Sequence, residues 1–190
     1  MAADEAPGEL EVVRAFLNTW SIPNDESREP LDELEQLHGD PAAWEGALPG
    51  VRRPGRAALP QLRHLRTALR EVLGRSHPAG LAPWLSALPL RPRLDPDESS
   101  RPVSLVPQRM SAAGQLLSFA VNAMSDGDWH RLRACPDCRY VFFDSSRNGS
   151  RTWCRMTRED EHGRSCGSLA KARAKRARDR MDQAAPTVRA

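Results

Sequence analysis

Residues 135–154 read CPDCRYVFFDSSRNGSRTWC, and this stretch decides how the carboxyl-terminal part of the chain folds. Its two leading cysteines have the two-residue spacing at which one tight turn directs both sulfurs to a tetrahedral metal. A strand-like run at 140–143 and an Asn-Gly turn signal follow, and residues 151–153 lead back to Cys154. We therefore expect a metal-binding knuckle and then a hairpin that returns Cys154 to the knuckle.

All four cysteines of the chain lie between residues 135 and 166. Cys166 precedes a series of Ala, Lys and Arg with no helix breaker before Pro186, so the fourth sulfur is expected at the start of a final helix. Four thiolates form a soft, closed tetrahedral site, which favours one structural zinc ion; iron with the same ligands would be expected to transfer electrons. The expected zinc ligands are Cys135, Cys138, Cys154 and Cys166.

Three alternatives to this zinc site stay open, and iron on the same four cysteines is the first. His162 lies between the last two cysteines and could replace Cys166 as a nitrogen ligand. Four buried thiols without metal are disfavoured, because a segment so small and charged would then have little reason to fold. A site closed by four cysteines offers no position to water or substrate, and the other histidines fall in no catalytic motif, so we expect no enzyme activity.

Positive charge is concentrated at the carboxyl end of the chain. The whole chain has a formal charge of +3, but residues 129–180 contain 14 Lys plus Arg against 6 Asp plus Glu. Such asymmetry indicates a module that binds a polyanion, although a basic helix can also serve only to keep a protein in solution. The residues expected to contact nucleic acid are Arg147, Arg151 and Arg155 near the hairpin, and Lys171, Arg173, Lys175, Arg176 and Arg178 on the final helix.

The residues before the knuckle predict a mostly helical domain. Apolar side chains recur at helical spacing from Leu10 to Trp20 and again from Leu31 to Leu37, where a Gly-Asp-Pro sequence is expected to end the second helix. The clearest apolar stripe runs from Leu59 to Leu73, with Gly74 at the C-cap position. These stripes predict helices that share one core.

A β-hairpin and one more helix are expected before the knuckle. Residues 88–94 and 103–106 are typical of two strands around a polar turn, and Ser111 is expected to cap a helix that reaches Met124. The fold class is therefore α+β. We divide the chain into a helical regulatory domain (1–128), a treble-clef-like zinc finger that ends in a basic helix (129–182) and a flexible tail (183–190).

No apolar run approaches the roughly 20 residues that cross a bilayer, and the acidic amino terminus lacks the basic start of a signal peptide. We therefore expect a cytoplasmic protein without a membrane partner. Thiols stay reduced in the cytoplasm, which favours metal over disulfides as the role of the cysteines.

The cysteine-containing stretches resemble the CGNR zinc finger family. These are bacterial proteins whose finger has a CxxC knuckle, a hairpin of the form FxDxSRNxSRxWC and a helix that begins CGNRAKxRR. The matching stretches here are 135–154 and CGSLAKARAKR at 166–176. Two departures change the pattern: residues 159–165 look like an insertion, and Ser168 and Leu169 replace the Asn and Arg of the family motif.

That family also has an amino-terminal ABATE domain, described as a stress-induced transcription regulator, with an early FxNT motif that Phe16–Thr19 resembles. The resemblance implies DNA binding and transcriptional control. We therefore expect a transcription regulator that binds double-stranded DNA, associates with the nucleoid when bound, and uses its amino-terminal domain to sense a signal or to form a homodimer. Two other functions stay open: a module that docks on an acidic protein, and a thiol-based redox sensor that releases zinc on oxidation.

Overall fold

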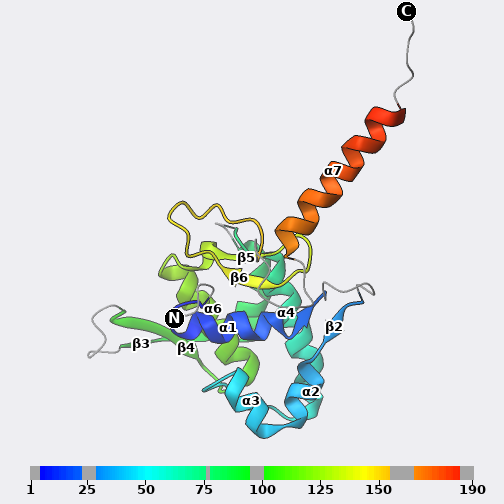
Figure 1. Ribbon diagram of the computed structural model, residues 1–190. Coiled ribbons are helices and arrows are strands. Elements are labelled where there is room, and N and C mark those ends of the chain that lie inside the picture. Colours follow the sequence, from blue (N-terminus) through cyan, green and yellow to red (C-terminus); the bar gives the residue numbers. More distant parts are fainter. Residues whose placement is uncertain (1–4, 23–28, 76–77, 95–100, 155–164, 185–190) are drawn as a thin grey trace, which may run out of the picture.

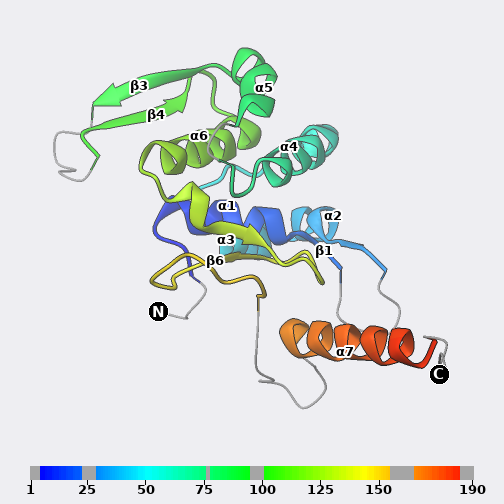
Figure 2. The ribbon, with the colours of Figure 1, turned by 90° about the horizontal axis from the view of Figure 1, so that it is seen from above.

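The computed structural model describes residues 5–22, 29–75, 78–94, 101–154 and 165–184, and it shows the expected α+β fold (Figures 1 and 2). The helices are α1 (Glu9–Asn18), α2 (Leu34–Gly39), α3 (Pro41–Ala47), α4 (Leu59–Glu71), α5 (Ala82–Ala87), α6 (Ala112–Ser125) and α7 (Cys166–Ala184), with 3-10 turns η1 (Arg56–Ala58), η2 (Ala79–Leu81) and η3 (Trp129–Arg131). The strands are β1 (Trp20–Ser21), β2 (Leu31–Asp32), β3 (Leu90–Leu94), β4 (Val103–Pro107), β5 (Leu132–Ala134) and β6 (Val141–Phe143).

Helices α1, α4 and α6 contact one another and enclose the core. Each has an apolar stripe at helical spacing, and the stripes meet at fully buried side chains such as Phe16, Leu65 and Leu116. Ser111 caps α6 as expected, since its hydroxyl accepts a hydrogen bond from the backbone N–H of Gly114 at 3.1 Å. These three expected helices are confirmed.

The expected hairpin before α6 is also confirmed. Strands β3 and β4 pair antiparallel, from Leu90 opposite Pro107 to Leu94 opposite Val103, and β4 lies against α6. The side chain of Asn122 on α6 bonds both the N–H and the C=O of Leu105, at 2.9 and 3.0 Å, which fixes the hairpin to the core.

The structure corrects the predicted ends of the first two helices. Thr19 ends α1 because its hydroxyl donates to the carbonyl of Phe16 and accepts from Arg66. Trp20 therefore enters the short strand β1, which pairs with β2, and Leu31 lies in β2 instead of a helix.

Two short helices were not expected from the sequence. The Gly-Asp-Pro sequence that ends α2 also starts α3, because the side chain of Asp40 accepts hydrogen bonds from the backbone N–H groups of Ala42 and Ala43, and Pro41 takes the first helical position. Helix α5 likewise begins with a proline near its first position.

The hairpin of the finger differs from the prediction. Strand β6 pairs with β5, on the amino-terminal side of the knuckle, with Leu132 opposite Phe143 and Ala134 opposite Val141. Residues 151–153 form no strand. The knuckle is the connection between the two strands: the Cys135 N–H donates to the Tyr140 carbonyl at 2.9 Å and continues the ladder into the turn.

The core continues across the expected boundary at residue 128. Trp129, Leu132, Val141 and Phe143 belong to the same buried cluster as the side chains of α1, α4 and α6. The indole N–H of Trp129 also donates to the carbonyl of Val72, at 3.1 Å. The three-part division of the chain stays a prediction, but its first boundary does not coincide with a gap in the core.

We call the described residues between 5 and 128 the body, and helix α7 extends away from it in both ribbon views (Figures 1 and 2). It begins at Cys166 and is 19 residues long. None of the helices in the described ranges is both long enough and apolar enough to cross a membrane.

Candidate metal centre

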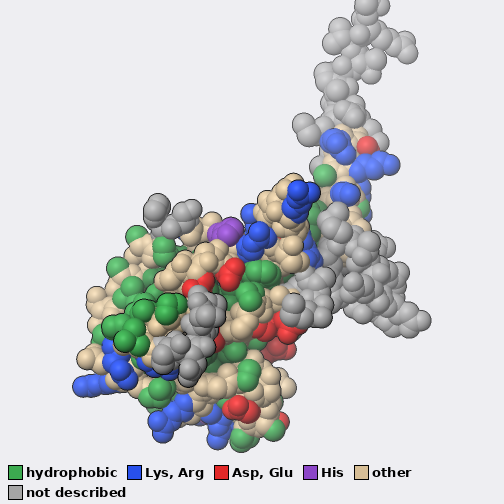
Figure 3. All heavy atoms as spheres, turned by 90° about the vertical axis from the view of Figure 1, so that its left-hand side faces the viewer, with side chains coloured by type: hydrophobic (Ala, Val, Ile, Leu, Met, Phe, Trp, Pro, Cys, Tyr) green, Lys and Arg blue, Asp and Glu red, His purple; other side chains and the backbone are tan. Residues whose placement is uncertain are grey.

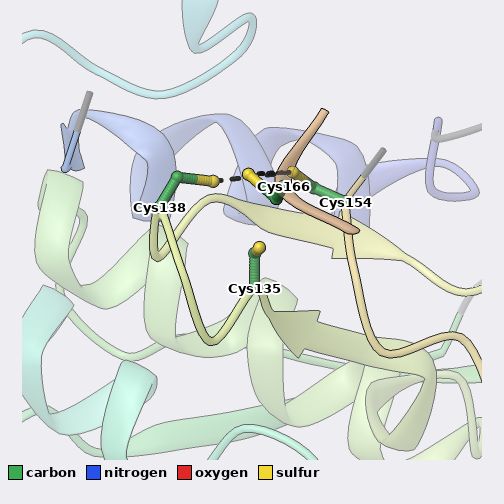
Figure 4. A group of neighbouring side chains, drawn as sticks. All are labelled: Cys135, Cys138, Cys154 and Cys166. Carbon is green, nitrogen blue, oxygen red and sulfur yellow. Dashed lines mark hydrogen bonds between the residues drawn. The ribbon is translucent and has the colours of Figure 1, made fainter. Parts of the chain in front are cut away.

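The four cysteines meet at one buried point, to which three parts of the finger contribute (Figure 4). Cys135 and Cys138 come from the knuckle, Cys154 from the end of the following loop, and Cys166 from the first turn of α7. All four sulfurs lie within 4.8 Å of one another, and the Cys138–Cys154 and Cys154–Cys166 pairs are 3.5 and 3.7 Å apart. Tetrahedral zinc with bonds of about 2.3 Å requires sulfurs about 3.8 Å apart, so the cluster fits one zinc ion.

The crowding of the four thiols makes them ionise unequally. Hydrogen bonds with Cys138, Cys154 and Cys166 lower the pKa of the Cys135 thiol. Hydrogen bonds with Cys135 and Cys138 raise the pKa of the Cys154 and Cys166 thiols, and burial acts in the same direction. A divalent cation at the centre would allow all four thiols to lose their protons, because it compensates the charge that the thiolates impose on one another.

The knuckle closes through a residue in the left-handed conformation. Arg139 has φ 61°, and it is the only residue other than glycine with positive φ in the described part of the chain. Its N–H donates to the Cys135 carbonyl at 2.9 Å, which completes the turn that brings the first two sulfurs together.

Asp144 organises the loop that brings Cys154 back to the knuckle. The carboxylate is fully buried and accepts hydrogen bonds from the backbone N–H groups of Ser146 and Arg151, at 3.0 and 2.8 Å, and from the Ser146 hydroxyl. Burial by itself would raise the pKa of Asp144, but these hydrogen bonds and the charge of Arg133 outweigh it and hold the pKa below its usual value.

Arg151 supports the third ligand from within the loop. Its guanidinium lies over the ring of Phe142, 4.8 Å from the centroid, and donates to the carbonyls of Trp153 and Cys154. The side chain is half-buried. From the sequence we expected Arg151 to contact nucleic acid. In the structure its guanidinium contacts the Phe142 ring and the carbonyls of Trp153 and Cys154.

Arg173 fixes α7 to the knuckle. It forms an ion pair with Asp137, whose side chain is 5% exposed and lies between the first two ligands. Helix α7 is thus held near its start by the Cys166 ligand and again, two turns later, by Arg173. Arg147, Lys171, Lys175, Arg176 and Arg178 are exposed, while Arg155 and the alternative ligand His162 lie outside the described residues.

The body holds the finger through contacts that the sequence did not reveal. Val141 turns its N–H and C=O away from β5, and Asn18 of α1 bonds both, at 2.7 and 2.8 Å, as an additional strand would. Arg14 donates to the Tyr140 hydroxyl at 2.8 Å. The Ile22 N–H donates to the Cys138 carbonyl at 2.9 Å. In the sequence, the only signal for this interface was a polar Asn18 beside an apolar stripe.

The arrangement defines a zinc-binding protein with a closed four-cysteine finger. Residues 131–179 match the family model of the CGNR zinc finger, and this range contains all four cysteines and most of α7. No curated protein sequence matches the chain. The comparison confirms the CGNR resemblance for the finger and supports one structural zinc ion on Cys135, Cys138, Cys154 and Cys166. Residues 1–130 lie outside the match, so the ABATE assignment stays a prediction.

Proposed function

We propose that this protein is a bacterial transcription regulator whose zinc finger binds double-stranded DNA through α7. The observation that carries the proposal is a helix that extends from the body with exposed cations along its described length (Figures 1 and 3). In this proposal the protein acts in the cytoplasm and the amino-terminal part senses a signal or dimerises. The exposed cations are Lys171, Arg173, Lys175, Arg176, Arg178 and Arg180.

The helical repeat sorts these cations into two opposite rows. At about 100° per residue, Lys171, Lys175 and Arg178 form one row, and Arg173, Arg176 and Arg180 form the other. Arg173 binds Asp137, so the second row begins on the side of the helix that meets the knuckle. We assign the main DNA contacts to the first row, here named the outward row.

The dimensions and the charge of α7 suit a DNA groove. An α-helix of 19 residues is about 28 Å long, and the major groove of B-DNA, about 12 Å wide, admits a single helix. Cations that neutralise phosphates release condensed counterions, so binding should weaken steeply with salt. The zinc ion supplies no chemistry in this function; it fixes Cys166 and thereby the direction of α7.

The test is a titration of zinc-loaded protein with a labelled DNA duplex at several salt concentrations. We expect the Lys171→Gln, Lys175→Gln, Arg178→Gln triple variant to bind more weakly and to reduce the slope of log affinity against log salt by about 3. A matched control removes the same charge from exposed arginines of the body, through Arg75→Gln, Arg91→Gln and Arg109→Gln. Equal losses in the two triple variants, or no binding by the wild type at low salt, would contradict the proposal.

A further inference from the structure

A cavity of about 530 Å³ lies at the seam between α4 and the zinc knuckle. Arg63, Arg66 and Arg70 line it from successive turns of α4, and Arg139 lines it from the knuckle. Trp20 of β1 also contributes to its wall. The cavity is therefore shared by the body and the finger, and α7 does not contribute to it.

The positive charge of this cavity exceeds its negative charge. Two carboxylates, of Asp32 and Glu71, line the same space. Asp32 is already engaged, because the buried Arg66 bonds both its oxygens, at 2.6 and 3.1 Å, and Arg63 lies 3.2 Å away. Arg70 and Arg139 form no ion pair with any residue that the structure describes. Two guanidiniums thus face the cavity without a carboxylate of their own.

Arg70 is held in place before any ligand arrives. Its guanidinium carbon lies 4.7 Å from the centre of the Trp20 ring, and its terminal nitrogens donate to the carbonyls of Leu17, Trp20 and Arg139. The body and the knuckle thereby direct both terminal nitrogens, while none of these contacts uses Nε. A cation fixed in this way loses little side-chain freedom when an anion binds.

We propose that this cavity binds a phosphate group between Arg70 of α4 and Arg139 of the knuckle, with Arg63 at its edge. Planar guanidinium groups bond phosphate oxygens in pairs, and a phosphate has enough oxygens to satisfy two or three of them at once. A carboxylate has only two oxygens and would satisfy only one guanidinium group in this way. The cavity is larger than one phosphate, so it leaves room for the molecule that carries the group, either a free nucleotide or the DNA backbone.

The proposal is independent of α7 and concerns a different part of the finger. Arg139 directly follows the ligand Cys138, and Arg70 bonds the Arg139 carbonyl. A bound phosphate would therefore contact the body and the zinc knuckle together. It should strengthen the seam between them.

The first test uses the full-length, zinc-loaded protein and inorganic pyrophosphate as the probe, with isothermal titration calorimetry at low salt. Arg139→Gln keeps the backbone and removes an exposed cation, and it should weaken binding at least tenfold. Arg63→Gln should weaken binding to a smaller extent, because the guanidinium of Arg63 is already paired with the carboxylate of Asp32, which also pairs with Arg66. Arg109→Gln removes the same charge at an exposed position outside the cavity and should change the affinity less than twofold. No binding by the wild type, or equal losses in Arg139→Gln and Arg109→Gln, would overturn the proposal.

A competition experiment distinguishes the two sources of phosphate. If DNA occupies the cavity, a duplex displaces pyrophosphate, and Arg139→Gln weakens duplex binding more than Arg109→Gln does. If a free nucleotide occupies it, a nucleoside triphosphate binds in an Arg139-dependent manner and the duplex does not displace it. Either result supports a phosphate site. Failure of the α7 proposal would appear separately, as unchanged DNA binding in the outward-row variant while pyrophosphate still binds.

Discussion

Arg139 closes the zinc knuckle in a strained backbone conformation, and in our proposal its side chain also binds phosphate. Its left-handed conformation closes the knuckle, yet a residue with a Cβ atom is disfavoured there by about 1 kcal/mol relative to glycine. We expect Arg139→Gly to raise the free energy of unfolding by about 0.5–1 kcal/mol in urea at a fixed zinc concentration, and at the same time to weaken pyrophosphate binding as Arg139→Gln does. Arg139→Ala removes the same charge but keeps the Cβ atom, so it should weaken phosphate binding without gaining stability. A stability gain shared by both variants would show that charge, and not backbone strain, is the cause.

Asp144 is a buried carboxylate whose only described roles are structural. Asp144→Asn places an amide where two backbone N–H groups need an acceptor, and it should lower the free energy of unfolding by about 1–3 kcal/mol. The folded pKa of Asp144 lies below its ordinary 3.8, so its contribution is present above that value and is lost only as the pH falls through the lowered folded pKa. Urea unfolding should therefore give the same wild-type-to-variant difference from about pH 5.5 to about pH 8. A difference that shrinks steadily across this range would mean that another group carries the effect.

For single residues, the sequence predicted the zinc ligands better than it predicted whether a charged side chain faces solvent or the protein. Four cysteines clustered within 32 residues at metal-ligand spacing predicted a metal site, and the structure brings their sulfurs together. A basic side chain, in contrast, has the same sequence signature whether it faces solvent or the protein. Arg151 stacks on Phe142 and Arg173 pairs with Asp137 because the fold places those partners within reach, and no local pattern records that.

At the scale of elements, the contact between α1 and β6 fixes the finger on the body. Asn18→Ala leaves the N–H of Val141 without a partner and leaves its C=O with only the long 3.5 Å hydrogen bond from Arg14, and it should lower the free energy of unfolding by about 2 kcal/mol. The Val141 amide should exchange its hydrogen faster, which NMR can measure for that residue alone. Asn148→Ala changes an exposed asparagine of the finger loop and serves as the control. Unchanged exchange at Val141 would show that Asn18 does not protect this edge of β6.

Helices and strands with a clear sequence pattern could be predicted, but which strands pair with one another was harder to predict. The stripes of α1, α4 and α6 follow helical spacing, and the β3–β4 hairpin is bounded by turn residues, so all four regions appear where the sequence indicated. The Asn-Gly sequence suggested that β6 pairs with the chain after it. The structure pairs β6 with β5, because the knuckle already reverses the chain and the buried Asp144 engages the backbone of the following residues with its own oxygens.

At the scale of the whole molecule, the finger and the body share apolar side chains that a free-standing finger would expose. Leu132 and Val141 are fully buried in the cluster that α1, α4 and α6 form. Burying such a side chain contributes about 1.5–3 kcal/mol, which is large for so small a module. The zinc site and the helical core should consequently lose their structure together.

We therefore expect urea to release zinc and to unfold the body in one transition. Tryptophan fluorescence of a Trp153→Phe variant reports the shared core, because Trp44 and Trp129 are 1% and 2% exposed there while Trp153 packs against the cysteine cluster. A chromophoric chelator reports zinc release. The two midpoints should coincide, and removal of zinc should lower the free energy of unfolding by roughly 4 kcal/mol relative to protein in free zinc at about 1,000 times its Kd. Zinc release at clearly lower urea than the fluorescence change would mean that the finger unfolds alone. That outcome would place a true domain boundary near residue 128 and would show that Leu132 and Val141 contribute little to holding the two parts together.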